Sequence, residues 1–352
     1  MSKVIVGMSG GVDSAVTAYL LKEQGYDVIG VTLRTWEPDG DLHNRCCEMD
    51  DARRVCIALG VPYYPITAND IFKCHVIDPF VDSYLKGKTP NPCIECNRYV
   101  KWAKMIDVMR YMGADYIATG HYAYIIEKND RYTVKTAKYA AKDQTYMLYK
   151  LTQDDLAHTL MPLGDYSKDE VRKIAEKAGL PVAKKPDSQE ICFIPDDDYA
   201  GYINAHLEGK SVKNGNFVDT NGTVIAPHKG IINYTIGQRK GLGIAAKAPL
   251  YVQSINAENG DVVLGSNEDL FTNEVVIGDT NYLSIEGLRA GESVRALAKI
   301  RYHHAPAAAT ITGLDDNRAQ ITFDEPVRAV TPGQSAVFYD DDMCVVGGGI
   351  IE

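Results

Sequence analysis

The chain carries two groups of residues whose types and spacing suit chemistry. The first is the run Ser9–Ser14 (SGGVDS), which closely follows the apolar residues Val4–Val6. Glycines and small polar residues between a strand and a helix present backbone N–H groups at the positive end of the helix dipole, and they let an anion approach the backbone. The run therefore predicts a phosphate-binding loop. A simple N-cap would explain one polar residue and not the whole run.

The second group consists of cysteines. Cys93 and Cys96 have the spacing CxxC, and Cys192 lies in the separate segment Asp187–Ile194. Eight cysteines in 352 residues are too few for a secreted disulfide scaffold, so clustered cysteines favour redox, sulfur or metal chemistry. The isolated cysteines are expected to be small, buried, apolar residues: Cys56, Cys74 and Cys344.

The composition predicts a globular protein of two or three domains, with 45% hydrophobic and 24% charged residues. Every apolar run is shorter than the roughly 20 residues that span a membrane, and the first residues do not resemble a signal peptide. We therefore expect a cytoplasmic protein with no membrane partner. The net charge of -10 argues against non-specific binding to polyanions, although a local basic patch can still bind nucleic acid.

The positions of β-rich and helical patterns predict an α/β fold class. In the first half they alternate, which predicts a Rossmann-like parallel sheet covered by helices in a domain over residues 1–205. Short alternating segments with turn signals follow, and they predict two small β-rich units over 206–270 and 271–352, the last a β-barrel. Among the expected helices are Lys101–Gly113 and Lys168–Gly179, the second capped by Ser167 with Glu170.

The run Ser9–Ser14 after a strand resembles the PP-loop of the ATP pyrophosphatases. That resemblance implies cleavage of ATP between its α and β phosphates, which leaves an adenylylated intermediate. It also implies that Asp13 orients the loop or helps to hold Mg²⁺. The implied ATP-binding residues are Gly7, Met8, Ser9, Gly10, Gly11, Val12, Asp13, Ser14, Leu33 and Gly120.

The two cysteine segments, Thr89–Arg98 and Asp187–Ile194, resemble those of the bacterial tRNA-specific 2-thiouridylases. Further blocks resemble that family in the same order: Ala118–Ala123, Lys142–Tyr146, Tyr234–Gly243, Lys299–Tyr302 and Val330–Gln334. The resemblance implies ATP-dependent 2-thiolation of the wobble uridine of tRNA, by a PP-loop domain with a β-rich half that helps to capture tRNA.

The implied chemistry answers a reactivity problem. The C2 carbonyl of uracil is a poor electrophile, and transfer of AMP to its oxygen creates a phosphate leaving group. By the resemblance, Cys192 carries a persulfide, Cys96 is the nucleophile and Asp13 completes the catalytic set. The terminal sulfur attacks directly, or it leaves as sulfide when Cys96 attacks the persulfide; the second route leaves a transient Cys96–Cys192 disulfide. Arg98 or a helix N-terminus could lower the pKa of a thiol here.

Cys93 opens an alternative, because many members of that family carry aspartate at this position. Cys93, Cys96 and Cys192 could hold a 4Fe-4S cluster that presents sulfide. Zinc is a weaker option, since a structural site needs four ligands and the adjacent pair Cys46-Cys47 is poorly spaced for chelation. Another alternative is a PP-loop ligase for a small substrate, which would need no essential cysteine.

The tRNA contacts are implied by the same resemblance. A wobble base must leave its stack before an enzyme can act on it. The implied contact residues are Asn91, Pro92, Cys93, His121, Lys142, Asp143, Gln144, Arg301, Tyr302 and Gln334. The expected partners are the tRNAs for glutamate, glutamine and lysine, and a sulfur donor such as a cysteine desulfurase or a sulfur-relay protein. The basic run Gly237–Gly241 suits RNA phosphates.

Overall fold

A parallel sheet forms the N-terminal part of the protein, in a computed structural model that describes residues 1–35, 49–186, 191–194 and 198–352. Its five strands run in the order β3-β2-β1-β4-β7, and each neighbouring pair is parallel. The strands are β1 (Lys3–Gly7), β2 (Asp27–Arg34), β3 (Tyr63–Thr67), β4 (Tyr116–Ala118) and β7 (Thr159–Leu160). The chain order reverses beside β1, and this is where parallel sheets bind ligands at the carboxyl ends of their strands.

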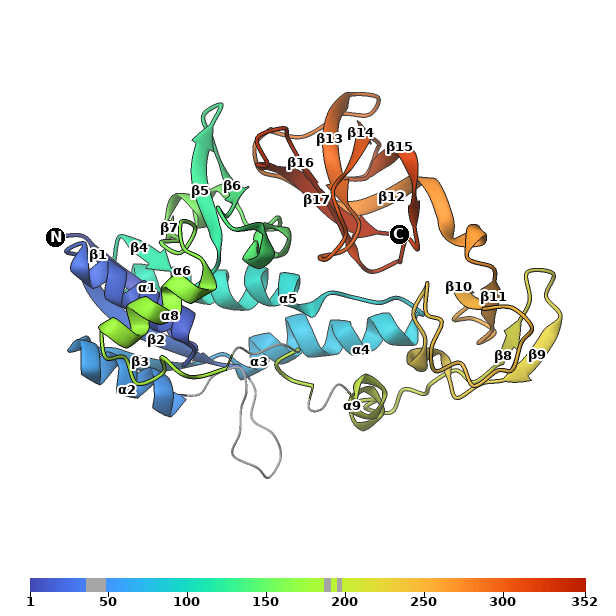
Figure 1. Cartoon of the computed structure of the whole chain (residues 1–352), viewed down its shortest axis with the longest axis horizontal. Helices are drawn as coiled ribbons and strands as arrows, with labels where there is room; N and C mark the ends of the chain where they lie inside the picture. Colours follow the sequence, from blue (N-terminus) through green and yellow to red (C-terminus); the bar gives the residue numbers. More distant parts are fainter. Residues whose placement is uncertain (36–48, 187–190, 195–197) are drawn as a thin grey trace.

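Helices cover both faces of this sheet (Figure 1). Val4 and Val6 of β1 pack in one hydrophobic cluster with α1, α2 and α8, whereas Ile5 packs in another with α6. Successive strand residues point to opposite faces, so the apolar run of β1 serves both clusters. The helices are α1 (Val12–Glu23), α2 (Met49–Leu59), α6 (Ala103–Tyr111) and α8 (Lys168–Lys177). The predicted cap of α8 is confirmed, because Ser167 and Glu170 form a capping box.

A helical layer extends from the sheet toward the β-rich half. Its elements are α3 (Asn69–Phe72), a π-helical segment (Lys73–Ile77), α4 (Asp78–Leu85), α5 (Pro92–Glu95), a second π-helical segment (Cys96–Trp102) and α9 (Tyr199–Ala205). The helix expected to begin at Lys101 begins at Pro92 instead, because Asn91 caps it and a proline occupies its first turn. The turn from Cys93 to Cys96 is therefore helical.

Smaller elements join the sheet to the barrel. They are the hairpin β5 (Ala123–Lys128) and β6 (Arg131–Thr136), the helix α7 (Gln153–Ala157), and the 3-10 turns Ala140–Lys142 and Thr145–Met147. The hairpin lies beside the barrel (Figure 1), and Thr133 Oγ1 donates a hydrogen bond to Val345 O at 2.6 Å. Tyr146 OH donates likewise to Ser335 O at 2.7 Å. These buried bonds fix the barrel against the N-terminal part.

The C-terminal half is entirely β-rich apart from short 3-10 turns. A four-stranded sheet, in the order β10-β11-β8-β9, contains β8 (Asn216–Val218), β9 (Val224–Pro227), β10 (Tyr251–Ile255) and β11 (Val262–Gly265), with a 3-10 turn at Ile231–Asn233. A 3-10 turn (Glu268–Leu270) leads into a closed barrel in the order β12-β15-β14-β13-β16-β17. Its strands are β12 (Phe271–Tyr282), β13 (Ser293–Lys299), β14 (Ala307–Gly313), β15 (Ala319–Arg328), β16 (Ser335–Tyr339) and β17 (Val345–Ile351).

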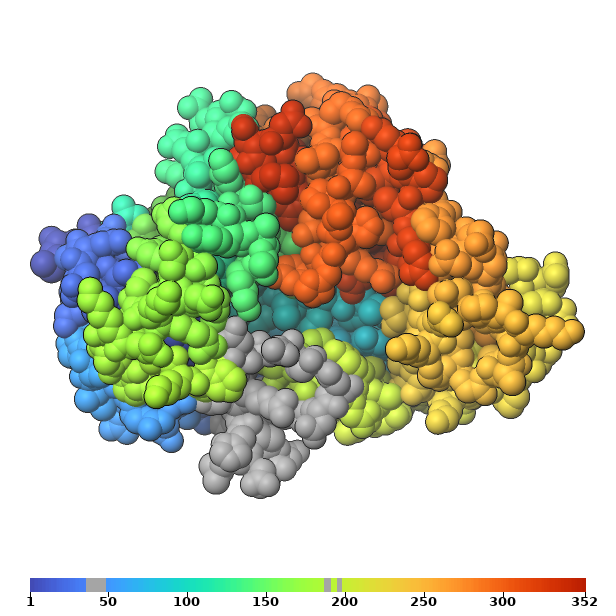
Figure 2. Space-filling model, viewed as in Figure 1, coloured from blue at the N-terminus to red at the C-terminus, as the bar shows by residue number. Residues whose placement is uncertain are grey.

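The predicted fold class is confirmed: a Rossmann-like parallel sheet precedes a β-rich unit and a closed barrel. Figure 2 shows the barrel seated between the β5–β6 hairpin and the β8–β11 unit, above the helical layer. The largest hydrophobic cluster is continuous through these parts, from Ile5 in the parallel sheet to Val252 in β10 and Val337 in β16. In the described part of the chain, no helix combines the length and apolarity needed to cross a membrane.

Candidate active site at the end of the parallel sheet

The loop between β1 and α1 is organised by its own hydroxyl groups. Ser9 N donates to Ser14 Oγ at 3.2 Å, Gly11 N donates to Ser9 Oγ at 3.3 Å, and Ser14 Oγ donates to Gly11 O at 3.1 Å. Gly10 has a φ of 73°, a left-handed conformation that favours glycine. Gly11 is the N-cap of α1 and brings no side chain to cap it. The first turn of α1 thus has the form of an anion-binding helix terminus.

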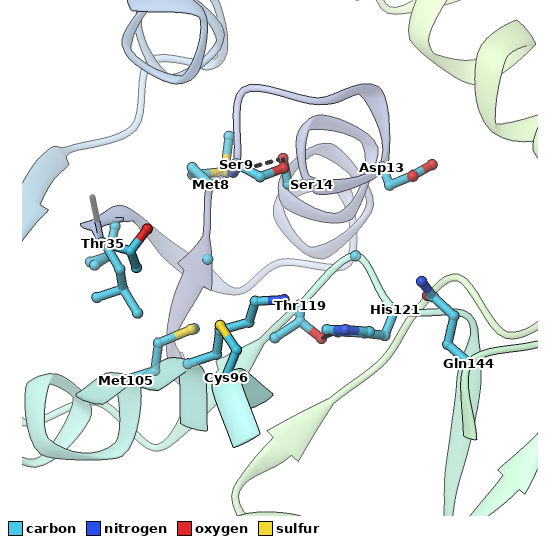
Figure 3. A pocket seen from close by; sticks show the side chains of 15 residues that line it. Met8, Ser9, Asp13, Ser14, Thr35, Cys96, Met105, Thr119, His121 and Gln144 are labelled. Atoms are coloured by element: carbon cyan, nitrogen blue, oxygen red, sulfur yellow. Dashed lines mark hydrogen bonds between the residues drawn. The ribbon is translucent and has the colours of Figure 1, made fainter. Parts of the chain in front are cut away.

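A cavity of about 220 Å³ lies in front of this loop (Figure 3). Residues at the carboxyl ends of β1, β2 and β4 line it, which places the cavity at the reversal point of the strand order. Seven of the residues expected to bind ATP line it: Gly7, Met8, Ser9, Asp13, Ser14, Leu33 and Gly120. The lining does not include Gly10, Gly11 or Val12. Val12 is the first residue of α1, and its side chain packs in the hydrophobic cluster that contains Val4 and Val6.

Position 120 requires glycine, because its backbone lies very close to the backbone of Asp13 and Ser14. A Cβ atom at this position would lie 2.9 Å from both the carbonyl carbon of Asp13 and the amide nitrogen of Ser14. Real Cβ atoms do not come so close to backbone atoms. The absence of a side chain therefore lets the end of β4 close one wall of the cavity.

The Asp13 carboxylate has two hydrogen-bond donors that the sequence did not reveal. Lys168 Nζ donates to its two oxygens at 2.7 and 2.8 Å, and Tyr122 OH donates to Oδ1 at 2.7 Å. A second lysine, Lys185, donates to Gly10 O at 3.1 Å and to Asp51 Oδ2 at 2.8 Å, and burial lowers its pKa. The loop is therefore flanked by two cations. Both lysines are far from Asp13 in the sequence, so no local pattern indicated them.

Cys96 lines the same cavity from the opposite wall. Cys96 is only 6% exposed, and Figure 3 shows its side chain pointing from the helix into the space in front of Ser9 and Ser14. Lys101 and Met105, from the following turns of the helix, also line the cavity. The cavity thus brings a thiol and a cation to the expected phosphate-binding loop.

Arg98 does not line this cavity. Its guanidinium lies 4.7 Å from the centre of the Tyr99 ring, and its Nη1 lies 3.8 Å from Asp279 Oδ2. Cys96 lies inside the continuous helix that begins at Pro92, after its first turn, rather than at the helix N-terminus. Of the described residues, Lys101 is the cation that shares the cavity with Cys96.

His121 and Gln144, both expected to contact tRNA, lie on the wall of the same cavity. His121 Nδ1 and Thr119 Oγ1 are 2.9 Å apart, and the imidazole lies 5.3 Å from the Trp102 ring. Burial and the charge of Lys101 lower the pKa of His121 to about 3, so the imidazole is neutral at physiological pH. A neutral imidazole can accept or donate a hydrogen bond, but it cannot act as a fixed positive charge.

A second, larger cavity of about 740 Å³ lies between the helical layer, the β8–β11 unit and the barrel, and we call it the groove. Gln334 Nε2 donates to Thr89 O at 2.8 Å across it, and Asn91 Oδ1 accepts from Cys93 N at 3.2 Å. Five of the expected tRNA-contacting residues line the groove: Asn91, Pro92, Cys93, Tyr302 and Gln334. These residues come from segments far apart in the chain, and the structure brings them together.

Arg301 and Asp143 lie in neither cavity and make contacts within the protein instead. The Arg301 guanidinium donates to Ile236 O at 3.2 Å and to Ala329 O at 2.6 Å, and burial lowers its pKa. The Asp143 carboxylate accepts from Thr145 Oγ1 at 2.7 Å, and burial raises its pKa. Both side chains thus hold neighbouring segments together. Lys142 is exposed at the end of a 3-10 turn.

Cys192 lies beside the groove. Its neighbour Ile191 lines the groove together with Cys93. The next residue, Phe193, is buried, and its ring packs at 5.6 Å from Phe72, 5.4 Å from Phe80 and 5.3 Å from Tyr202. Cys192 is thereby anchored on the helical layer.

The six cysteines that the structure describes are not joined in disulfides, so no disulfide links Cys96 to Cys192. Within the described residues, no group of three or more histidine, cysteine or acidic side chains could hold a metal ion, so the structure does not support the 4Fe-4S alternative. Cys46 and Cys47 lie outside the described residues. The expectation that Cys74 is buried was wrong, because it is exposed on a π-helical turn, whereas Cys56 and Cys344 are buried.

Comparisons with known proteins cover the whole length of the chain. Family models match three successive parts: "tRNA methyl transferase HUP domain" over residues 2–196, "tRNA methyl transferase PRC-barrel domain" over 201–266 and "Aminomethyltransferase beta-barrel domain" over 272–351. A solved structure titled "U34-tRNA thiolase NcsA from Methanococcus maripaludis with its [4Fe-4S] cluster" is 22% identical and covers 59% of this chain and 66% of its own, with a TM-score of 0.36. That likeness is too weak to inform function.

Curated relatives are far more similar. The protein named "tRNA-specific 2-thiouridylase MnmA" from Lachnoclostridium phytofermentans is 52% identical over 100% of both chains. The protein of the same name from Clostridioides difficile is 52% identical over 99% of this chain and 98% of its own. The chain therefore belongs to the tRNA-specific 2-thiouridylase family.

Proposed function

We propose that this protein uses ATP to replace the C2 oxygen of the wobble uridine of tRNA with sulfur. One observation carries the proposal: the Cys96 side chain lines the same cavity as Ser9 and Ser14 of the phosphate-binding loop. A ligase for a small substrate would need no thiol there. Relatives named as 2-thiouridylases along the full chain support the same reaction.

The first step is adenylation. ATP binds in the cavity with its adenosine against Leu33 and Gly120, and the N–H groups of the loop hold the pyrophosphate that leaves. The uracil C2 oxygen attacks the α phosphate, so the bond between the α and β phosphates breaks. The product is an O-adenylylated uridine whose C2 carries a good leaving group.

Asp13 suits a magnesium ion bound with ATP. Its side chain is 32% exposed, and it is the carboxylate among the described residues that line the cavity. Mg²⁺ bound to a nucleotide takes one or two protein carboxylates together with phosphate oxygens, so this single carboxylate fits. When bound there, the ion would neutralise phosphate charge. Lys168 holds the same carboxylate in place and adds its own positive charge near the loop.

The second step is sulfur transfer. The terminal sulfur of a Cys192 persulfide attacks C2, and AMP leaves. The Cys96 thiolate then attacks the Cys192 sulfur, which releases the thiolated base and forms a Cys96–Cys192 disulfide. In the alternative order, Cys96 attacks first and releases sulfide, which then attacks C2. Both orders leave the same disulfide, and two electrons from a reductant restore the thiols.

The RNA binds in the groove, and the target base leaves its stack to reach Cys96. Asn91, Pro92 and Cys93 contact this base, and Tyr302 and Gln334 contact the RNA from the barrel. His121 and Gln144 contact it at the nucleotide cavity. The exposed Lys142 contacts the RNA directly, whereas Asp143 and Arg301 position the segments around the contact surface through their hydrogen bonds within the protein.

We propose that the substrates are the tRNAs for glutamate, glutamine and lysine. The sulfur donor is a cysteine desulfurase or a sulfur-relay protein, and the protein acts in the cytoplasm. The domains are residues 1–205, 206–270 and 271–352.

Mass spectrometry of nucleosides tests the proposal. Purified protein is incubated with unmodified tRNA, ATP, Mg²⁺ and a persulfide donor, such as a cysteine desulfurase with cysteine, and the tRNA is digested to nucleosides. We expect a 2-thiouridine nucleoside together with AMP and pyrophosphate, a loss of this product with Cys96→Ser, and normal product with the exposed control Cys74→Ser. Formation of AMP without any thiolated nucleoside would overturn the proposal in favour of a ligase.

A further inference from the structure

Cys93 and Cys96 lie one turn apart on the helix that begins at Pro92, yet they line different cavities. Cys93 is partly exposed and lines the groove, whereas Cys96 is nearly buried and lines the nucleotide cavity. The pair therefore connects the outer groove with the thiol at the site of the reaction. The proposed mechanism gives Cys96 a role as nucleophile but gives the Cys93 thiol no chemical role.

The geometry of this turn suits a disulfide between the two residues. The Cys96 N–H donates to both Cys93 O and Pro92 O, so the turn between the two cysteines is closed by hydrogen bonds. Residues three apart in an α-helix have Cα atoms about 5 Å apart. Disulfides need a Cα separation of roughly 4.4–6.8 Å, so the Cα spacing of this turn is compatible with one. A CxxC pair in such a turn is typical of dithiols that exchange with other disulfides.

We propose that Cys93 is the resolving thiol of the sulfur-transfer cycle. This inference rests on the proposed function, which leaves a Cys96–Cys192 disulfide after each turnover. The Cys93 thiolate attacks Cys96 Sγ, the Cys96–Cys192 bond breaks, and a Cys93–Cys96 disulfide forms. Cys93 loses its proton to solvent, and Cys192 leaves as a thiolate that is ready for a new persulfide. An external dithiol reductant then supplies two electrons and two protons to the Cys93–Cys96 disulfide.

The exposures of the three cysteines support this order of events. A reductant must reach a sulfur atom along the line of the disulfide bond, and Cys96 is nearly buried. Cys93 offers an accessible sulfur on the wall of the open groove. Cys192 is also partly exposed, so direct reduction at Cys192 is the competing route. The two routes differ in whether a Cys93–Cys96 disulfide ever forms.

Alkylation and peptide mapping distinguish the routes. The enzyme turns over with tRNA, ATP, Mg²⁺ and a persulfide donor that supplies sulfane sulfur to Cys192, while a thioredoxin-type dithiol is limiting. Samples are quenched with an alkylating agent and digested with trypsin. Cys93 and Cys96 fall in one tryptic peptide, Thr89–Arg98, and Cys192 falls in another, Lys185–Lys210. A Cys93–Cys96 disulfide therefore gives an unalkylated single peptide, and a Cys96–Cys192 disulfide gives a cross-linked pair.

We expect the wild type to accumulate the oxidised single peptide, and Cys93→Ser to accumulate the cross-linked pair instead. In Cys93→Ser, we expect the steady-state rate, divided by the variant's own first-turnover rate, to fall at least tenfold. This normalisation removes any effect of weaker tRNA binding. Cys74→Ser is the control for loss of an exposed thiol, and its ratio should stay at the wild-type value.

Two results would overturn the role of Cys93: a wild type that never forms the oxidised peptide, or a Cys93→Ser variant with an unchanged ratio. Both leave the proposed function intact, because the first turnover still yields thiolated tRNA. Failure of the proposed function is recognised separately, since the wild type would then give no thiolated nucleoside and no disulfide to Cys192.

Discussion

Gly120→Ala adds one methyl group where the end of β4 meets the phosphate-binding loop. The new Cβ would lie 2.9 Å from backbone atoms of Asp13 and Ser14, which cannot rotate away as a side chain can. Overpacking of this kind costs about 1–3 kcal/mol. If the loop shifts to relieve the contact, the cost appears as about 5- to 150-fold weaker binding of ATP.

Calorimetric titration of the variant with ATP and Mg²⁺, in the absence of tRNA, measures this change. Gly278→Ala is the matched control, because its Cβ would lie 2.7 Å from Glu352 Oε1, the end of a side chain that can move. We expect the control to bind ATP within about twofold of wild type, a difference below 0.5 kcal/mol. Wild-type affinity in a folded Gly120→Ala protein would refute the idea that this close approach shapes the ATP site.

Three further predictions follow from contacts around the site. Asp13→Asn should lower the rate of pyrophosphate release with tRNA at least tenfold, because the neutral amide holds Lys168 and Mg²⁺ poorly; an unchanged rate would remove Asp13 from the catalytic set. The pKa of His121 is lowered to about 3, so the unfolded chain binds more protons between pH 6.5 and 3, and stability should fall as pH falls through this window. Chemical unfolding at pH 7 and 4.5 should therefore show a smaller acid loss for His121→Gln than for wild type, and an equal loss would contradict the lowered pKa. Arg301→Ala should lower the free energy of unfolding by about 1–3 kcal/mol, because Ile236 O and Ala329 O lose their shared donor; a variant as stable as wild type would argue for an RNA contact instead.

Features encoded by short stretches of sequence were predictable. The strand, glycine-rich loop and helix around Ser9–Ser14 are contiguous, so their pattern indicated the phosphate-binding loop directly. The start of helix α8 was predictable from Ser167 and Glu170, which form its capping box. In both cases the interacting groups are a few residues apart.

Other features were missed because their signals were weak or their partners distant. The hairpin β5–β6 turns at Asn129 and Asp130, both with positive φ, and this pair of turn residues was its one local signal. The contact of Lys168 with Asp13 spans 155 residues and leaves no local pattern. The division of Cys93 and Cys96 between two cavities depends on the packing of the barrel and the helical layer, which sequence spacing alone does not describe.

The most direct test of the proposed chemistry follows a single sulfur atom. Protein loaded with a persulfide is freed of donor and mixed with unmodified tRNA, with or without ATP and Mg²⁺. The Cys192 peptide and the tRNA nucleosides are then quantified together. We predict that sulfur leaves Cys192 and appears in 2-thiouridine in equal amounts, only when ATP is present. Thiolation at the wild-type rate by Cys192→Ser, or transfer without ATP, would contradict the account.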